Sequence, residues 1–340
     1  MKSLIPILFL LLCSCKNDLE VIQPGKTLPI IYGLVSPQDS VYRIRLTRSF
    51  LAEGDIETVA RNPDSLYFYN ADVRLQLRTA DGGIIGEKEM KLTQIEDKTD
   101  GLFVTHPNYI YQCNPFDVSF KDLPAGAEFN LIVEVPDADS TASAQSKIPE
   151  EPELLSALGL LTKSTVNLFH FTRNVVLIKH VREFYTEFEL IFRYSEYRLD
   201  SWVPKEFVYT RKIMPGEPQY YPEGQPLWRR EYPDSIYLDE AFMYPLISNR
   251  INEDPEVTSR QFKEIELRVF NADAEFANYY YAGQYLTDYN NQNYSNIING
   301  LGLFASYWTM TYPAMNLNNQ SMDSLCSGRF TKNLKFRNWE

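Results

Sequence analysis

The sequence predicts a mainly β protein in which an antiparallel sandwich precedes a second β-rich domain with one or a few short helices. Short stretches of alternating polar and apolar residues recur between turn sequences over residues 28–150. The chain has 23 Tyr and 20 Phe but only 15 Gly, a balance that favours sheets over helical bundles. Prolines and like charges in Ile148–Glu153 interrupt regular structure, so we place a domain boundary near residue 150 and assign residues 151–340 to the second domain.

Residues 1–14 have the layout of an export leader. Lys2 precedes an apolar run, Leu4–Leu12, that is too short to cross a bilayer of roughly 30 Å. The sequence Leu-Cys-Ser-Cys that follows predicts cleavage before Cys15, whose thiol then carries lipid. An ordinary secretory leader and a short buried helix are the alternatives. Two or three acyl chains, such as palmitoyl groups, would anchor the protein permanently. Residues 15–27 would then form the tether between the lipid and the folded part.

The residues after Cys15 bear on location. Lys16, rather than an acidic residue, favours passage to the outer membrane under the sorting rule of enteric bacteria. Asp18 and Glu20 resemble a surface-export signal, although Asn17 and Leu19 interrupt it. We therefore expect a lipid-anchored outer-membrane protein that faces outward rather than toward the periplasm.

Charge and cysteine content narrow the partners. With 33 basic and 45 acidic side chains the net charge is −12, and no cluster of Lys and Arg suited to phosphate backbones is present, so nucleic acid is not expected as a partner.

The predicted lipidation leaves two cysteines for the folded part of the chain. Cys13 leaves with the leader and Cys15 takes lipid. Cys113 and Cys326 then form one pair, either as a disulfide in an oxidising compartment or as two separate buried thiols.

Strands of the first domain follow from alternation and turn chemistry. Asp81-Gly82-Gly83 is a hairpin turn, and Pro136 ends the last strand because proline cannot donate to a sheet. The expected strands are Leu28–Leu34, Val41–Leu46, Val73–Arg78, a strand opening at Ile84, and Phe129–Val135.

The second domain has the same signals and one helix. The helix is expected after Asn271, where cap residues and Glu275 precede apolar side chains at helical spacing. The expected strands of this domain are Phe184–Phe192, Glu206–Ile213, Glu264–Phe270 and Gly300–Tyr307. A proline-punctuated aromatic region and an Asn-rich loop, residues 290–299, separate them.

Several of these features resemble one family. The Leu-Pro-Ala-Gly turn at Leu123–Gly126 leads into an apolar strand, and Asn296–Phe304 reads Asn-Ile-Ile-Asn-Gly-Leu-Gly-Leu-Phe. Together with the lipidation sequence they resemble the uncharacterised Bacteroidota outer-membrane lipoproteins catalogued as domain of unknown function four-two-four-nine. The resemblance spans nearly the whole mature chain. It implies an Ig-like or transthyretin-like N-terminal sandwich and a gene that frequently lies near the genes of TonB-dependent outer-membrane transporters, and it implies no catalytic residue.

Metal, cofactor and catalytic signatures are weak. The histidines, His106, His170 and His180, lack the close spacing of a zinc helix, and no nucleophile elbow, Walker loop or dinucleotide fingerprint occurs. Glu187 and Glu189, which could form an acid and base pair with Glu183, alternate with apolar residues as a solvated strand face would. The acidic and Asn side chains of residues 288–296 lack a calcium-loop order. We expect no cofactor, no metal and no enzymatic activity.

Aromatic residues on a proline-stiffened segment form a possible binding surface. Such rings stack on sugars or anchor protein partners, although large rings are more often buried in a core. The rings belong to Tyr220, Tyr221, Trp228 and Tyr232.

Asp-Ser followed by an apolar residue or Thr recurs along the chain. This pattern resembles the O-glycosylation sequon of Bacteroidota envelope proteins, and it also fits turns in which Asp and Ser bond nearby backbone amides. The candidate serines are Ser40, Ser65, Ser140, Ser235 and Ser324.

These observations predict a non-enzymatic outer-membrane lipoprotein that binds a ligand or a protein partner as an accessory to a TonB-dependent β-barrel. A structural or adhesive envelope lipoprotein is the second hypothesis, and a glycan-acting hydrolase is the third.

Overall fold

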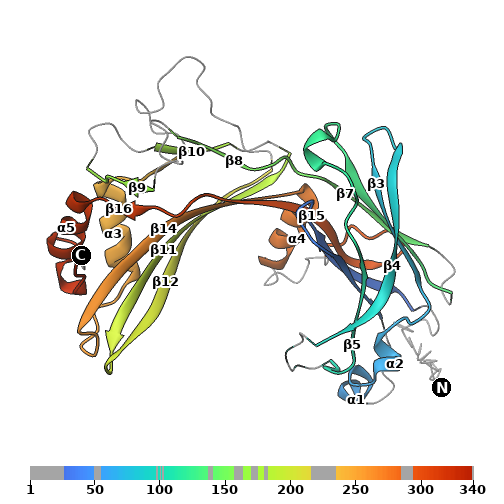
Figure 1. Cartoon of the computed structure of the whole chain (residues 1–340). Helices are drawn as coiled ribbons and strands as arrows, with labels where there is room; N and C mark the ends of the chain where they lie inside the picture. Colours follow the sequence, from blue (N-terminus) through green and yellow to red (C-terminus); the bar gives the residue numbers. More distant parts are fainter. Residues whose placement is uncertain are drawn as a thin grey trace, which may run out of the picture.

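The computed structural model describes residues 27–49, 55–96, 99, 101, 103–136, 141–156, 164–169, 175–179, 183–215, 235–284 and 294–338 (Figure 1). The chain forms an arch with an N-terminal half and a C-terminal half, and one eleven-stranded sheet runs through both. The predicted mainly β fold with few short helices is confirmed. No helix in these ranges is long and apolar enough to span a bilayer.

The N-terminal half is a sandwich of antiparallel neighbours. Its strands are β1 (Pro29–Val35), β2 (Tyr42–Arg48), β3 (Asp72–Arg78), β4 (Ile84–Ile95), β5 (Asn108–Cys113), β6 (Glu128–Glu134) and β7 (Ala142–Lys147). The long β4 joins the two layers, because residues 84–90 pair with β3 whereas residues 91–95 pair with β5. Alternate side chains point inward and fill the core, among them Ile44, Leu75 and Leu131, all fully buried.

Strand β15 (Leu301–Thr311) belongs to both halves. Residues 301–306 pair in parallel with β1, and residues 307–311 pair with β14 (Ser259–Ala272). Phe304 is fully buried in the N-terminal core, although it comes from the segment that the sequence assigned to the second domain. Gly302 has φ +114°, and a Cβ there would lie 1.9 Å from the Ile31 carbonyl oxygen, so this close parallel pairing requires glycine.

The C-terminal half is built on three long antiparallel strands, β11 (Tyr185–Arg198), β12 (Ser201–Ile213) and β14. The helices α3 (Glu240–Arg250) and α5 (Asn319–Ser327) cover one face of these strands (Figure 1). Two small sheets complete the core: β8 (Glu153–Ser156), β10 (Val175–Lys179) and β13 (Ser235–Tyr237) form one, and β9 (Thr165–Val166) with β16 (Asn316–Leu317) forms the other. Phe188, Ile247 and Leu267 are fully buried between strands and helices.

The short helices α1 (Ile56–Ala60) and α2 (Pro63–Leu66) hang from the N-terminal half, and α4 (Ala274–Gln284) lies under the junction of the halves (Figure 1). The α4 helix confirms the helix predicted after Asn271. Helices α3 and α5 and the strands β5 and β7 were not predicted; α3 lies in the proline-punctuated region and carries Pro245 inside it.

The strands predicted from alternation are confirmed, since each overlaps one observed strand. The disulfide is not formed. Cys113 is a free thiol buried in the N-terminal core, whereas Cys326 is a free thiol packed against the C-terminal core. Burial raises the pKa of the Cys113 thiol to about 11, as expected for an inert structural cysteine.

A buried ion pair fixes the C-terminal segment. Arg260 on β14 is 1% exposed and bonds the Glu196 carboxylate at 2.9 Å, the Leu334 carbonyl at 2.7 Å and the Asn252 carbonyl at 2.9 Å. Glu196 is 3% exposed. Glu196 also pairs with Arg198 at 2.8 Å, whereas Glu196 is the one acidic partner of Arg260 among the described residues, so loss of Glu196 would leave a buried guanidinium without a counter-ion.

We predict that Arg260→Met lowers the free energy of unfolding by about 3–5 kcal/mol, because it removes the buried counter-ion of Glu196 and leaves the carbonyls of Leu334 and Asn252 without this donor. Arg268→Met is the matched control: its guanidinium is 38% exposed beside Glu189 and Glu266, so its loss should cost less than about 1 kcal/mol. Urea unfolding of both variants measures the difference. Equal losses would contradict the assignment.

Candidate binding site at the junction

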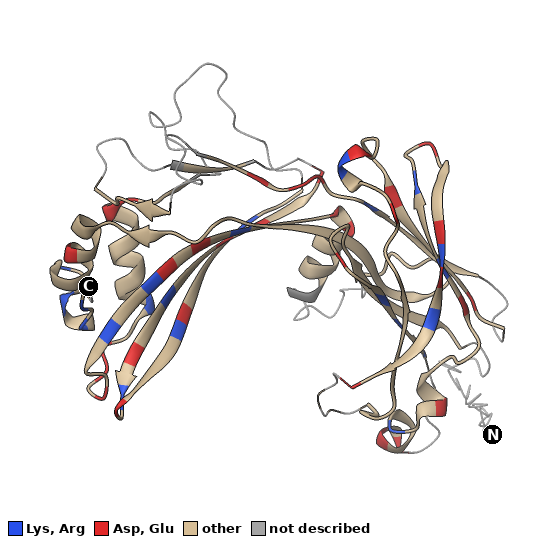
Figure 2. Ribbon diagram, viewed as in Figure 1, with Lys and Arg blue, Asp and Glu red and all other residues tan. Residues whose placement is uncertain are grey.

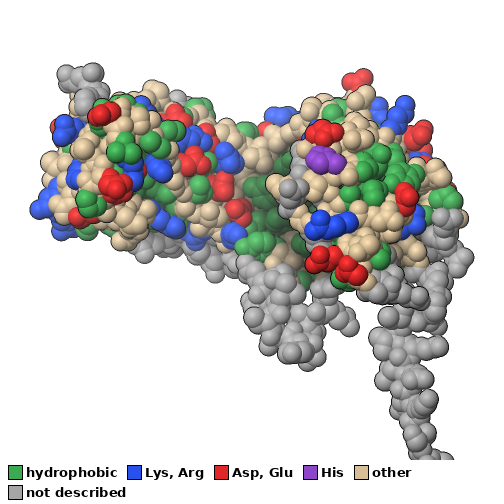
Figure 3. Space-filling view, turned by 90° about the horizontal axis from the view of Figure 1, so that it is seen from below, with side chains coloured by type: hydrophobic (Ala, Val, Ile, Leu, Met, Phe, Trp, Pro, Cys, Tyr) green, Lys and Arg blue, Asp and Glu red, His purple; other side chains and the backbone are tan. Residues whose placement is uncertain are grey.

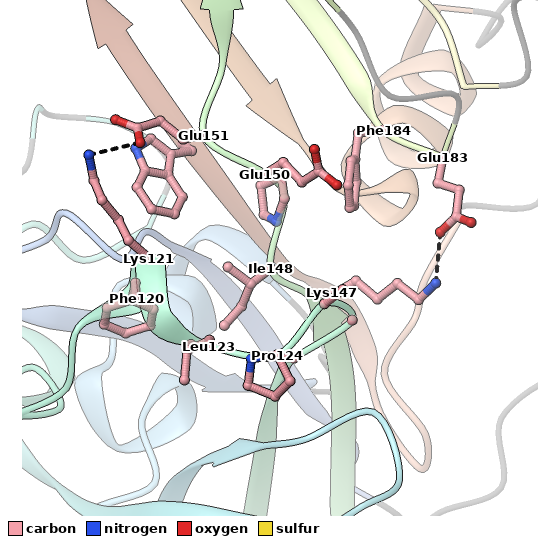
Figure 4. A pocket seen from close by; sticks show the side chains of 15 residues that line it. Phe120, Lys121, Leu123, Pro124, Lys147, Ile148, Glu150, Glu151, Glu183 and Phe184 are labelled. Carbon is pink, nitrogen blue, oxygen red and sulfur yellow. Dashed lines mark hydrogen bonds and ion pairs between the residues drawn. The ribbon is translucent and has the colours of Figure 1, made fainter.

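A pocket of about 650 Å³ lies where the two halves meet, between the Leu123–Gly126 turn and residues 147–151 (Figure 4). Leu123, Pro124 and Ile148 line one side, and Phe184, at the start of β11, faces them from the C-terminal half. The turn follows the 3-10 helix η1 (Phe120–Asp122), whose Phe120 packs against the N-terminal core. The pocket therefore has an apolar lining drawn from both halves.

Two ion pairs flank the pocket. Lys121 lies 2.9 Å from Glu151, and Lys147 lies 2.9 Å from Glu183 (Figure 4). Lys147 also holds the pKa of Glu183 below its usual range. Glu150 lines the pocket and pairs with no basic side chain of the described residues. These exposed pairs contribute little to stability, so a ligand can rearrange them at small cost.

Trp308 on β15 lines the pocket and carries a buried hydrogen-bond donor that is unused. The residue is 7% exposed and lines the pocket, yet its indole nitrogen is buried and has no hydrogen-bond partner in the described structure. Buried donors almost always form a hydrogen bond, since a buried donor without a partner lowers the stability of the fold by about 1–3 kcal/mol. A bound molecule with an acceptor would satisfy it once the side chains that cover the nitrogen move aside.

A buried polar cluster joins the two halves beside the pocket. The Ser146 hydroxyl oxygen on β7 lies 2.6 Å from Oδ2 of Asp273 and 2.7 Å from the hydroxyl oxygen of Ser306. The Ser306 hydroxyl donates to the carbonyl of Lys147 at 2.6 Å, and Oδ1 of Asp273 accepts from the Phe276 amide at the start of α4. Strands β7 and β15 and the end of β14 are thus held by one set of bonds.

The number of protons that this cluster needs indicates that Asp273 is neutral. The contacts of Ser146 with Asp273, of Ser146 with Ser306 and of Ser306 with the carbonyl need three protons, and the hydroxyls supply two. A protonated Asp273 supplies the third. Burial of the 2% exposed side chain is also the main cause that raises the pKa of Asp273 to about 7.

The predicted site residues are scattered in the structure. Leader residues 1–14, Cys15 and the aromatic group Tyr220, Tyr221, Trp228 and Tyr232 lie outside the described residues, as do His170 and His180. His106 is exposed, with Nδ1 3.3 Å from Glu96. Glu187 and Glu189 lie on a strand face and pair with Lys212 and Arg268, as predicted for a solvated face.

The candidate glycosylation serines also differ in setting. Ser40 is exposed at a turn, whereas Ser65 in α2 and Ser324 in α5 are half-buried. Ser140 and the side chain of Ser235 lie outside the described residues. Across the described ranges, no three His, Cys, Asp or Glu side chains are arranged to hold a metal ion.

The residues that form the junction were not singled out as a site from the sequence. Trp308, Ser146 and Ser306 have no local motif, and Asp273 was expected only to cap a helix. Their common signal is that each points inward from a strand or cap at the point where β15 passes between halves.

Comparison with known proteins adds no assignment. No protein-family model and no curated protein matches the chain. A crystal structure of the FN1–FN3 domains of chicken CNTN1 is similar over 86% of this chain and 68% of that chain, with 10% sequence identity and a TM-score of 0.21. This value is too low to relate the two arrangements, so the fold class rests on the structure itself.

We predict that Asp273→Asn removes a pH dependence of stability. Between about pH 4 and 7 folded Asp273 keeps a proton that the unfolded chain has lost, so wild-type stability falls as pH rises through this window. A rise of the Asp273 pKa from its ordinary value to about 7 corresponds to about 4 kcal/mol of stability. Urea unfolding at pH 5 and 8 should show Asp273→Asn to be the more stable protein at pH 8.

The control is Ser146→Ala, which removes a hydroxyl without changing the charge. It should lower stability at both pH values. If wild type and Asp273→Asn depend equally on pH, Asp273 ionises normally and the cluster is assigned wrongly.

Proposed function

We propose that this protein is a lipid-anchored, non-enzymatic binding protein of the outer membrane, whose small ligand occupies the junction pocket and whose partner is a TonB-dependent β-barrel. The leader and Cys15 support the anchor, and the resemblance noted above supports the partner. The resemblance stays a prediction, since no comparison supports or tests it.

The unpartnered indole nitrogen of Trp308 carries the ligand-binding part of the proposal. The residue lines a pocket of about 650 Å³, within the range of small-molecule sites, and its nitrogen lies buried behind the pocket surface. Apolar side chains beside carboxylates and lysines suit a ligand with both an apolar face and hydrogen-bonding groups, such as a saccharide or a short peptide.

The same pocket gathers Glu150, Glu151 and Glu183, which keeps a glycan hydrolase as a second candidate. Hydrolysis needs one carboxylic acid with a raised pKa. Lys147 instead lowers the pKa of Glu183, and Glu151 is paired with Lys121. The pairing of Glu151 and Glu183 with lysines favours binding over general-acid catalysis by these two residues, which leaves Glu150 as the one unpaired carboxylate among the described pocket residues.

Purification of the native protein in mild detergent tests the anchor and the partner together. We expect a mature chain that begins at Cys15 with acyl mass and carries a stoichiometric β-barrel. A lipidated protein without such a companion would favour a structural or adhesive role. A chain that retains its initiator methionine and has no acyl mass would refute the envelope assignment.

We predict that Trp308→Phe weakens ligand binding by about tenfold, because it keeps a ring but removes the N–H donor. Thermal shift with mono- and disaccharides and dipeptides would find a ligand, and titration of the variant would measure the loss. Trp202→Phe, on β12 and 41% exposed, is the matched control and should bind as wild type. Equal affinity of the Trp308→Phe variant would exclude the junction pocket.

A further inference from the structure

The arch encloses a hollow on its underside, opposite the junction pocket (Figures 1 and 3). One wall is the outer face of β1 and β2 in the N-terminal half, and the other is the outer face of β11, β12 and β14. Helix α4 fills the corner, where it contacts β15 and β11. Hydrophobic side chains gather in this hollow when it is seen from below (Figure 3).

The N-terminal wall is apolar and basic. Tyr32 and Leu34 on β1 are 45% and 42% exposed. Arg45 pairs in register with Tyr32, and Arg43 lies two positions away on the same face. Arg43 continues through Gln112 on β5 to Lys91 on β4. We call Tyr32, Leu34, Arg43, Arg45 and Lys91 the basic wall.

The charges of the basic wall are largely unused. Arg43 and Lys91 are exposed and form no ion pair with any described residue. The acidic neighbour of Arg43 is Asp39, which is engaged by the Ser36 amide at 2.8 Å and the Tyr307 hydroxyl at 3.1 Å. A positive surface attracts acidic groups, and this one stands on a chain whose net charge is −12.

On the opposite wall, Arg193 and Arg268 form ion pairs with neighbouring carboxylates. Basic and acidic side chains alternate along its strands (Figure 2). Arg193 pairs with Glu264 at 2.8 Å and with Glu266 at 3.0 Å, and Arg268 lies 3.3 Å from Glu189. The part of the hollow that lacks partners is therefore the basic wall.

Aromatic rings at the corner add an anchor point. Tyr279 of α4 is 37% exposed, and its ring lies edge-on to that of Tyr32 with centroids 6.2 Å apart. Tyrosine and arginine are the side chains most enriched where protein partners bind tightly. Rings held by a helix and a strand lose little freedom on binding.

The shape of the hollow selects its occupant. Helices α1 and α2 project below it on one side, and the turn between β11 and β12 projects on the other (Figure 1). A flat bilayer would meet these projections before it reached the basic wall. A convex ridge of another protein fits between them.

The length of the proposed tether indicates that this partner lies in or at the membrane. Residues 15–27 span at most roughly 45 Å, and the chain then enters β1, a strand of the basic wall. We propose that the basic wall and Tyr279 dock a ridge of a neighbouring membrane protein that presents apolar side chains flanked by carboxylates. This inference rests on the proposed function for the lipid anchor.

Site-specific photo-crosslinking in the native host tests the proposal. Benzoylphenylalanine replaces Leu34 in the full-length chain, and the same probe at Trp202 serves as the control at an equally exposed position on the other half. We expect one discrete membrane-protein adduct from position 34 and none from position 202. Mass spectrometry should place the cross-link among acidic and apolar residues of the partner.

Charge variants make the test specific. Arg43→Glu with Lys91→Glu should reduce the adduct at least tenfold. Lys205→Glu with Lys263→Glu alters the same net charge at exposed sites on β12 and β14 and should leave the adduct unchanged. An adduct insensitive to the first pair, or one with phospholipid, would overturn the proposal.

The outcome separates the two proposals. A lipidated protein that co-purifies with a β-barrel but gives no adduct from position 34 refutes the basic wall and leaves the proposed function standing. A protein without lipid removes the proposed function itself.

Discussion

The backbone hydrogen bonds of β15 join the N-terminal and C-terminal halves of this protein. The strand pairs with β1 in the sandwich and then with β14 in the other half, so the halves share a continuous sheet rather than a linker. Alternation along this strand distributes its side chains. Phe304 fills the N-terminal core, Ser306 enters the buried polar cluster, and Trp308 lines the pocket. Because these residues lie on one strand, the core, the cluster and the pocket are positioned by the same bonds.

Burial and exposure divide the charges of the molecule into two kinds. The described acidic residues that are almost wholly buried, Glu196 and Asp273, are handled differently: one faces Arg260, and the other is held among hydroxyls where a neutral acid completes the bonds. Most other pairs are exposed and contribute little to stability. The two proposed binding surfaces therefore use exposed charge, namely the lysines and glutamates of the pocket and the unpaired basic residues of the hollow.

Local pattern was enough to predict the strands, because one buried face imposes alternation on residues such as Val73–Arg78, and a cap with early acid marked the helix at α4. It failed at α3, where Pro245 and its neighbours suggested irregular chain. The pairing of β1 with β15 could not be predicted, since it joins residues some 270 apart in sequence and only Gly302 hints at a close approach. The pocket is likewise assembled from four distant segments, so Trp308 carried no local signal.

The shared strand also sets an order of events during biosynthesis. The sandwich begins at residue 29, but its β1 edge is covered only after residues 301–306 have been synthesised, near the end of the chain. Until then an apolar edge with unpaired amides is exposed, and such edges invite pairing with other chains. Maturation of the N-terminal half is thus a late step, and a chain truncated before Leu301 would leave its first strand open to aggregation.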